Sequence, residues 1–178
     1  MGRPRGFDEA EVVRRAARLF ADRSYDGVSI DDLVTHLELH RNSLYKTFGS
    51  KRGLYLAALR WSLEHEVAPL IEGIGRSGPP GPVLDEAIGT PDGPGALDLL
   101  LLAAAERAPA DPEVAGLVGR TFAALDEALS GRVPIAERGS VGALTAALIG
   151  LRLRVRSGTG GPQAAEAGAA LARLLDRH

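Results

Sequence analysis

Polar and basic side chains are concentrated in one short stretch, "RNSLYKTF", at residues 41–48. Leu44 and Phe48 stand four residues apart, so in a helix they share one face, which we expect to pack on a core. The other side of that helix carries donors and acceptors that suit base edges and phosphates: Arg41, Asn42, Ser43, Tyr45 and Lys46. The stretch therefore predicts a helix that binds nucleic acid on its outer face.

The residues before this helix predict the element that must position it. Ser29 precedes an amphipathic segment, and Asp32 follows three residues later, as in a capping box. A helix over residues 30–37, a break at 38–40 and the helix over 41–48 form a helix-turn-helix pattern. We expect Leu39, at the break, to staple onto Leu44 and so set the entry of the second helix.

Two basic segments flank this unit. Ser50 is expected to cap a long helix over residues 50–73, and Lys51 in its first turn could grip a phosphate together with the free backbone N–H groups. Near the N-terminus, "GRPR" carries Arg3 and Arg5, and such an arm could reach into a minor groove. The alternative for these two arginines is a disordered N-terminus.

Charge and composition agree with a DNA partner at one end. The net charge is -2, yet residues 1–60 hold 11 Lys and Arg against 8 Asp and Glu, while the remainder holds 10 against 15. Cysteine is absent, which excludes disulfides and thiol chemistry. No apolar run approaches the ~20 residues of a membrane span, and the start lacks the apolar core of a secretion signal. We expect a cytoplasmic protein with no membrane partner, from a GC-rich bacterial genome.

Apolar periodicity predicts an all-α chain. Helices are expected over residues 8–22, 29–37, 41–48, 50–73, 96–108, 112–130, 137–156 and 163–177, and glycine- and proline-rich breakers at 75–82 and 89–95 leave room for one short helix between them.

The segments "FDEAEVVRRAARLFADRSYDGVSIDDLV" and "LHRNSLYKTFGSKRGLYLAAL" resemble the N-terminal domain of the TetR family of transcriptional regulators. The resemblance covers about residues 7–59. It implies that Tyr45 and Lys51 contact phosphates, and that Ser29 and Thr47 add contacts to the DNA backbone. It also implies that four residues face an operator: Arg41, Asn42, Ser43 and Lys46.

Three positions depart from the family pattern. Glu38 stands where the turn usually has glycine, and His40 stands where the recognition helix is usually capped by Ser or Thr. Asn42 replaces a small residue before the serine. His40 is a poorer cap, but when protonated it can donate to a phosphate, so we include it among the DNA-binding residues.

Metal and catalytic chemistry find little support in the sequence. His36 and His40 are four residues apart, but the expected turn at Glu38 separates them and the spacing is not that of H-E-x-x-H. There is no nucleophile elbow, no phosphate loop and no grouping of His, Asp and Ser. We predict no metal, no cofactor and no enzymatic activity.

The C-terminal part carries two stripes of mostly small residues. Ala143, Ala147, Gly150 and Leu151 share one helical face, and Ala167, Leu171 and Leu174 share another. In the family the last two long helices pair with their twofold mates, which implies a homodimer here. The alternative is that these stripes pack inside one chain.

An effector pocket is expected between the helices of this part. We predict that it is lined by Trp61, His65, Leu101, Ala104, Phe122, Leu125 and Leu148. Polar anchors could come from His65, Asp98, Glu106, Arg107 or Thr121, although surface or ion-pair roles are the alternative for each. The scarcity of aromatic residues favours a small or aliphatic effector.

The sequence thus predicts an all-α protein of two domains. Residues 1–50 would form the arm and a three-helix domain with the helix-turn-helix, and residues 51–178 a helical bundle for effector binding and dimerisation. The function expected is that of a TetR-like repressor that binds palindromic operator DNA as a dimer and is released by a small-molecule effector. The alternative is a helical dimer that binds a ligand or partner without binding an operator.

Overall fold

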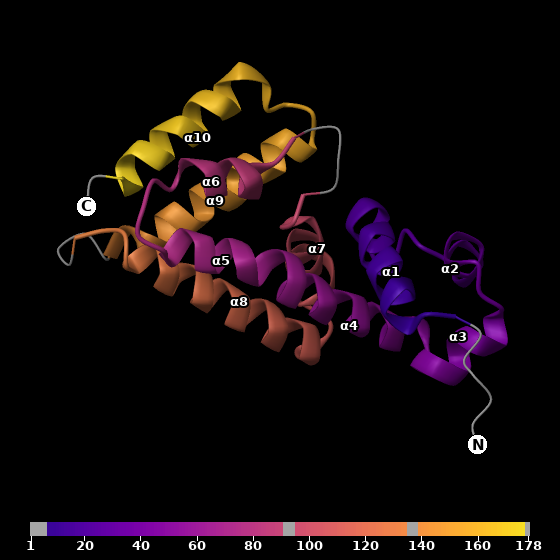
Figure 1. Ribbon diagram of the computed structural model, residues 1–178. Coiled ribbons are helices and arrows are strands. Elements are labelled where there is room, and N and C mark those ends of the chain that lie inside the picture. The colour runs from indigo at the N-terminus through magenta and orange to yellow at the C-terminus, as the bar shows by residue number, and fades with distance from the viewer. Residues whose placement is uncertain (1–6, 91–94, 135–138, 177–178) are drawn as a thin grey trace.

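The computed structural model describes residues 7–90, 95–134 and 139–176, and these residues contain helices and no strand (Figure 1). The elements are α1 (Glu9–Arg23), α2 (Ile30–Leu37), α3 (Arg41–Phe48), α4 (Lys51–Ser62), α5 (Ala68–Gly75), α6 (Gly81–Ile88), α7 (Asp98–Leu102), α8 (Pro112–Ser130), α9 (Val141–Arg156) and α10 (Gly161–Leu175). Two π-helical turns complete them, η1 (Leu63–Val67) and η2 (Ala103–Arg107). The predicted all-α class is confirmed, while Arg3 and Arg5 lie outside the described residues.

Helices α1, α2 and α3 form a small unit at one end of the molecule, which we call the head (Figure 1). Asp8 caps α1 and Ser50 caps α4 through their side-chain oxygens. The capping box predicted before α2 is present, because Ser29 accepts from the Asp32 N–H and Asp32 accepts from the Ser29 N–H. These caps satisfy N–H groups that a helix leaves unpaired at its start, so α1, α2 and α4 have defined N-terminal ends.

A long helical segment connects the head to the rest of the chain, which we call the body (Figure 1). It begins with α4, which packs on α1 and α7, and continues through η1 and α5 as far as Gly75. The continuous helix predicted over residues 50–73 is therefore interrupted by a π-helical turn. Apolar periodicity does not reveal this departure, because the segments on both sides of the turn are α-helical and keep the helical pattern.

The body contains α5 to α10, with α9 in contact with α6, α8 and α10. The predicted helix over 112–130 matches α8, and the short helix between the two breakers is α6. The segment predicted as one helix over 96–108 is α7 followed by η2. None of the helices formed by the described residues has the length and apolar character needed to cross a membrane.

A fully buried ion pair joins three segments of the body. Arg152 of α9 donates through Nε and Nη2 to the Asp98 carboxylate at 2.7 and 2.6 Å, and Arg156 adds a contact of 2.9 Å. Arg152 also donates to the carbonyls of Ile88, the last residue of α6, and of Thr90, two residues later. The end of α6 and the start of α7 are thereby held against α9 by charge and hydrogen bonds inside the core.

Glycine is required at two positions beside the Arg152 guanidinium. A Cβ at Gly95 would lie 2.5 Å from the guanidinium carbon, and one at Gly89 would lie 2.8 Å from Nη1. Gly89 also has a φ of 67°, which disfavours other residues. The buried arginine and these glycines therefore depend on one another.

Candidate nucleic-acid interface

Helix α3 presents two different surfaces, as its sequence predicts. Leu44 is fully buried and Phe48 packs against the core. On the other side Tyr45 is 42% exposed, an unusual exposure for a large apolar ring. Arg41, Asn42 and Lys46 are exposed as well, and Ser43 and Thr47 are half-buried. The outer surface of α3 therefore offers the set of donors and acceptors that base edges and phosphates require.

Two of the predicted DNA-binding residues already have partners within the head. The Ser29 hydroxyl donates to Asp32 at 2.6 Å while it caps α2. The Arg41 guanidinium is paired with Asp31 at 2.5 Å, and both side chains are largely exposed. A DNA contact by Arg41 would require this side chain to share or exchange Asp31, because a carboxylate at this surface repels phosphates.

The turn between α2 and α3 contains two of the three residues that depart from the family pattern, Glu38 and His40. Glu38 adopts a left-handed conformation with a φ of 55°, and its N–H caps the end of α2. Arg15 of α1 pairs with the Glu38 carboxylate at 3.3 Å and donates to the His36 carbonyl. His40 makes no side-chain cap to α3, in agreement with its weaker capping ability.

Lys51 lies at the start of α4, where it is expected to meet a phosphate. Its Nζ is 4.1 Å from the centroid of the Tyr25 ring, and the Arg107 guanidinium carbon is 4.3 Å from the same centroid. Partial burial lowers the pKa of Lys51, Asp26 opposes that shift, and Arg107 adds to it. A phosphate bound at the start of α4 would compete with the Tyr25 ring for this ammonium group.

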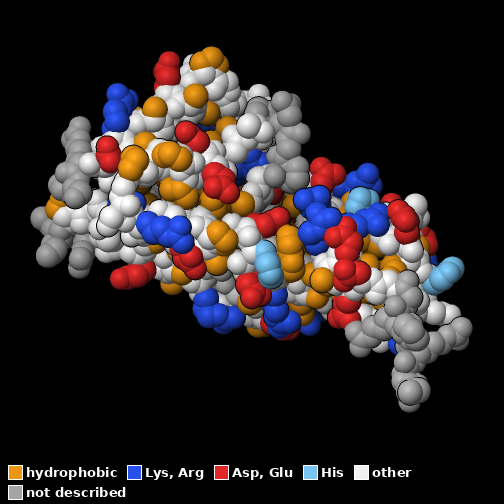
Figure 2. Space-filling view, viewed as in Figure 1, with side chains coloured by type: hydrophobic (Ala, Val, Ile, Leu, Met, Phe, Trp, Pro, Cys, Tyr) orange, Lys and Arg blue, Asp and Glu red, His pale blue; other side chains and the backbone are white. Residues whose placement is uncertain are grey.

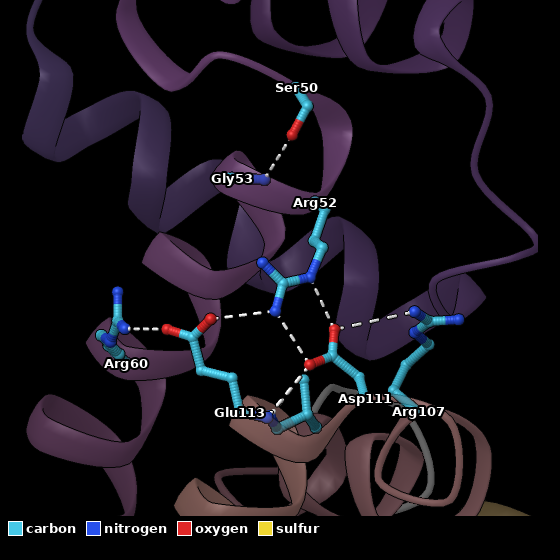
Figure 3. A network of polar contacts seen from close by, with 8 residues as sticks. Ser50, Arg52, Gly53, Arg60, Arg107, Asp111 and Glu113 are labelled. Atoms are coloured by element: carbon cyan, nitrogen blue, oxygen red, sulfur yellow. Dashed lines mark hydrogen bonds and ion pairs between the residues drawn. The ribbon is translucent and has the colours of Figure 1, made fainter.

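The residue after Lys51, Arg52, anchors the connecting helix α4 to α8 in the body (Figure 3). Arg52 donates to both oxygens of Asp111, at 2.7 and 2.9 Å, and to Glu113 at 2.9 Å. Glu113 is also paired with Arg60 at 2.5 Å. Asp111 is 5% exposed and caps α8 through the N–H groups of residues 113 and 114. The first turn of α4 is therefore fixed to the first turn of α8.

Hydrogen bonds from Arg52 are the main reason that the pKa of Asp111 falls from 3.8 to about 2. Burial opposes this shift, while the Val114 N–H and the charge of Arg52 contribute to it. The carboxylate is therefore ionised throughout the physiological range, and the connection between α4 and α8 remains charged.

The residues predicted to line an effector pocket lie in different environments. Leu125 and Leu148 are buried in the core, whereas Trp61, Leu101, Ala104 and Phe122 are half-buried. His65 is exposed and stacks on Trp61 with ring centroids 5.0 Å apart. Among the predicted polar anchors, Asp98 is instead the buried partner of Arg152, and Arg107 stacks on Tyr25. Glu106 is exposed and Thr121 is half-buried.

Sequence reasoning missed several residues that position the interface. Asp31, Tyr25 and Arg52 form their contacts across elements, so no local pattern indicated them. Asp111 directly precedes Pro112, which is a signal for a helix start that could have revealed its capping role. The partnership between Asp111 and Arg52, 59 residues apart, had no such signal.

Comparison with known proteins supports the interpretation of the head. A model of bacterial regulatory proteins of the tetR family matches residues 12–58. An uncharacterised helix-turn-helix transcriptional regulator of Bacillus subtilis (strain 168), YezE, is 36% identical over 138 residues, covering 72% of this chain and 69% of that protein. The chain belongs to the TetR family. The family predicted from residues 7–59 is thereby confirmed.

Three further transcriptional regulators extend the comparison. The Escherichia coli (strain K12) repressor BdcR is 33% identical over 87 residues, which is 49% of this chain and 44% of that repressor. A cysteine mutant of the TetR family regulator CifR, solved with a 26-base-pair operator, has a TM-score of 0.70 at 24% identity over 99% of both chains. A regulator from Saccharomonospora viridis solved with choline has a TM-score of 0.70 at 20% identity over 94% of both chains. These likenesses establish the shared fold.

Proposed function

We propose that this TetR family member is a repressor that binds palindromic operator DNA as a homodimer through the outer surface of α3. The observation that carries the proposal is the division of α3 into a buried side with Leu44 and an exposed side with Tyr45, Asn42 and Lys46. The family match over residues 12–58 and the helix-turn-helix geometry support it. Residues 1–50 would be the DNA-binding domain and residues 51–178 the effector and dimerisation domain.

The exposed surfaces of α9 and α10 support the dimer. Ala143 and Ala147 are exposed on α9, and two leucines have more than half of their surface exposed, Leu153 at 56% and Leu174 at 51%. Leucines of this kind at the surface suit a second copy of the chain. Leu151 and Leu171, which the sequence placed on the same stripes, are buried within the chain, so they belong to its own core.

An effector in the body would act through the long helical segment that ends in the head. Its first turn carries both the proposed phosphate contact, Lys51, and the anchor to α8, Arg52. A ligand that prefers one position of α4 relative to α8 shifts the population of DNA-competent dimers. One protein of the same fold was solved with operator DNA and another with choline, which supports this proposal.

Binding to a duplex selected from a random pool tests the proposal. The double variant Tyr45→Phe/Lys51→Ala should bind that duplex roughly tenfold to hundredfold more weakly, because it loses two phosphate contacts. The slope of log K against log salt should become less steep by about two, because each protomer of the dimer loses one cation. Fluorescence anisotropy at several salt concentrations gives both values.

The matched control is Arg76→Ala, which removes an exposed cation at the end of α5. It should leave both the affinity and the salt slope of DNA binding unchanged. If Tyr45→Phe/Lys51→Ala behaves like this control, the proposed DNA contact through α3 and α4 is wrong. A helical dimer that binds a ligand or partner without an operator then becomes the better description.

A further inference from the structure

A largely apolar groove of about 320 Å³ lies between the long helical segment and α8. Helices α5 and α8 lie side by side along the body (Figure 1), and hydrophobic surface is visible on this face beside charged side chains (Figure 2). The apolar lining consists of Leu63, Ala68, Ile71, Leu117 and Ala124. None of the seven residues predicted for the pocket lines this groove, although the predicted anchor Thr121 does.

The charged residues of the groove favour an anion. Arg60 of α4 and Arg120 of α8 line it, together with a single acid, Glu64 of η1. Arg60 is already paired with Glu113, whereas Arg120 is exposed and makes no hydrogen bond or ion pair with the residues that the structure describes. A guanidinium offers paired N–H donors that fit a carboxylate in a bidentate arrangement. Arg120 is therefore available to a ligand at the edge of an apolar surface.

The π-helical turn η1 supplies one wall of the groove. Leu63 and Glu64 both belong to this turn, where the hydrogen-bond register of the long segment changes. Single π turns of this kind occur frequently at functional sites, because they shift side chains away from the positions of a regular helix. The unusual backbone and the groove thus coincide.

We propose that this groove binds an aliphatic monocarboxylate of roughly six to ten carbons, a size that suits a cavity near the lower end of the usual range for ligand sites. The carboxylate of this ligand pairs with Arg120 and Arg60, and its aliphatic tail packs on the apolar lining from α5 and α8. The inference rests on the proposed function, because it makes this ligand the effector.

The pairing of Arg60 links the groove to the head. Glu113, which pairs with Arg60, also binds Arg52 in the first turn of α4, next to Lys51 (Figure 3). A ligand carboxylate competes with Glu113 for Arg60 and adds negative charge beside it. Occupancy of the groove therefore alters the ion pairs that hold the phosphate-binding turn of α4 against α8.

Calorimetric titration of the full chain without DNA tests the site with three probes of equal length: octanoate, 1-octanol and octylamine. Octanoate should bind at least tenfold more tightly than 1-octanol, and octylamine should bind most weakly. Arg120→Gln should weaken the binding of octanoate at least tenfold and leave the affinity for 1-octanol unchanged. Arg76→Gln, which removes an exposed arginine outside the groove, is the control and should change neither affinity.

Variants that fill the groove provide a second measurement. Thr121→Trp should abolish binding of octanoate and 1-octanol together. Ala124→Met, at an exposed lining position, covers the case in which Thr121→Trp disturbs α8. Equal binding of octylamine and octanoate, or octanoate binding that survives both Arg120→Gln and Ala124→Met, would overturn the proposal.

Anisotropy with the selected duplex separates this inference from the proposed function. Release of the duplex by octanoate, lost in Arg120→Gln, supports both. A chain that binds the duplex but not octanoate overturns the groove and leaves the DNA-binding function standing. A chain that binds octanoate through Arg120 but no duplex supports the site and counts against the repressor.

Discussion

An Arg–Asp ion pair of almost the same length occurs in the head and in the body, in opposite environments. Arg41 and Asp31 in the head are 2.5 Å apart with side chains 53% and 81% exposed. Arg152 and Asp98 in the body are 2.6 Å apart and each is 1% exposed. The pair of Arg52 and Asp111, 2.7 Å apart, is intermediate in burial, because only the acid is buried.

Burial decides what each pair can do. In water two unit charges at this distance attract weakly and exchange partners easily, whereas inside a protein an unpaired charge is very costly. Burial alone would raise the pKa of Asp98, but hydrogen bonds from Arg152 and the Gly95 N–H, with the charges of Arg152 and Arg156, outweigh it and lower that pKa. The pair in the body thus serves the fold, while the pair in the head is free to respond to DNA.

The largest expected effect comes from breaking the buried pair. Arg152→Met leaves the Asp98 carboxylate in the core without its main partner, so the free energy of unfolding should fall by about 3–5 kcal/mol. This is a large share of the ~5–15 kcal/mol that stabilises a typical domain. Equilibrium unfolding in urea measures the change.

The double variant Asp98→Leu/Arg152→Met is the control for the cost of an unpaired charge. It should recover a substantial part of the loss, because no charge remains buried. A loss below ~1 kcal/mol for Arg152→Met would mean that burial does not distinguish this pair from an exposed one.

The ion pair of Arg52 and Asp111, in which only the acid is buried, should contribute a free energy of unfolding that depends on pH. Because the pKa of Asp111 is lowered from 3.8 to about 2, its contribution is complete above about pH 4 and is lost as the pH falls toward about 2. Arg52→Gln removes the main cause of the shift, so the part of the acid-induced loss of melting temperature that Asp111 causes should shrink. Asp111→Asn should remove this titration altogether, and melting curves across that pH range test both. Unchanged acid profiles in both variants would contradict the assignment.

The smallest effect on stability is expected in the head. Asp31→Asn should change the free energy of unfolding by less than ~0.5 kcal/mol, as is usual for exposed ion pairs. Affinity for the selected duplex should instead rise, because each protomer loses a negative charge and releases Arg41, and the salt slope should steepen by roughly two. Asp85→Asn, an exposed acid on α6, is the matched control. A fall in DNA affinity would show that Asp31 instead orients Arg41 for its contact.

The head was predictable from the sequence because its determinants are local. The capping box at Ser29 and Asp32, the buried Leu44 and the exposed Tyr45 follow from spacings of three or four residues along one helix. The family was recognised on the same residues. The roles of individual side chains in DNA binding remain predictions.

The body was predictable in its helices but much less in its interior. The pairs Arg152–Asp98 and Arg52–Asp111 join residues 54 and 59 positions apart, and nothing in the local pattern selects them. The expected pocket combined residues that the fold leaves buried, half-buried or exposed. Helical periodicity predicts which face of a helix is apolar, but not which other helix packs against that face.

The sequence by itself thus determined the all-helical class, the two sides of α3 and the family, since these depend on the chemistry of neighbouring residues in the chain. Only the tertiary structure decided which charges are buried and which remain exposed. It also placed the groove beside Arg120 and attached the first turn of α4 to α8. The physical reason is that burial and ion pairing depend on which distant segments meet, and that is set by the packing of the whole chain.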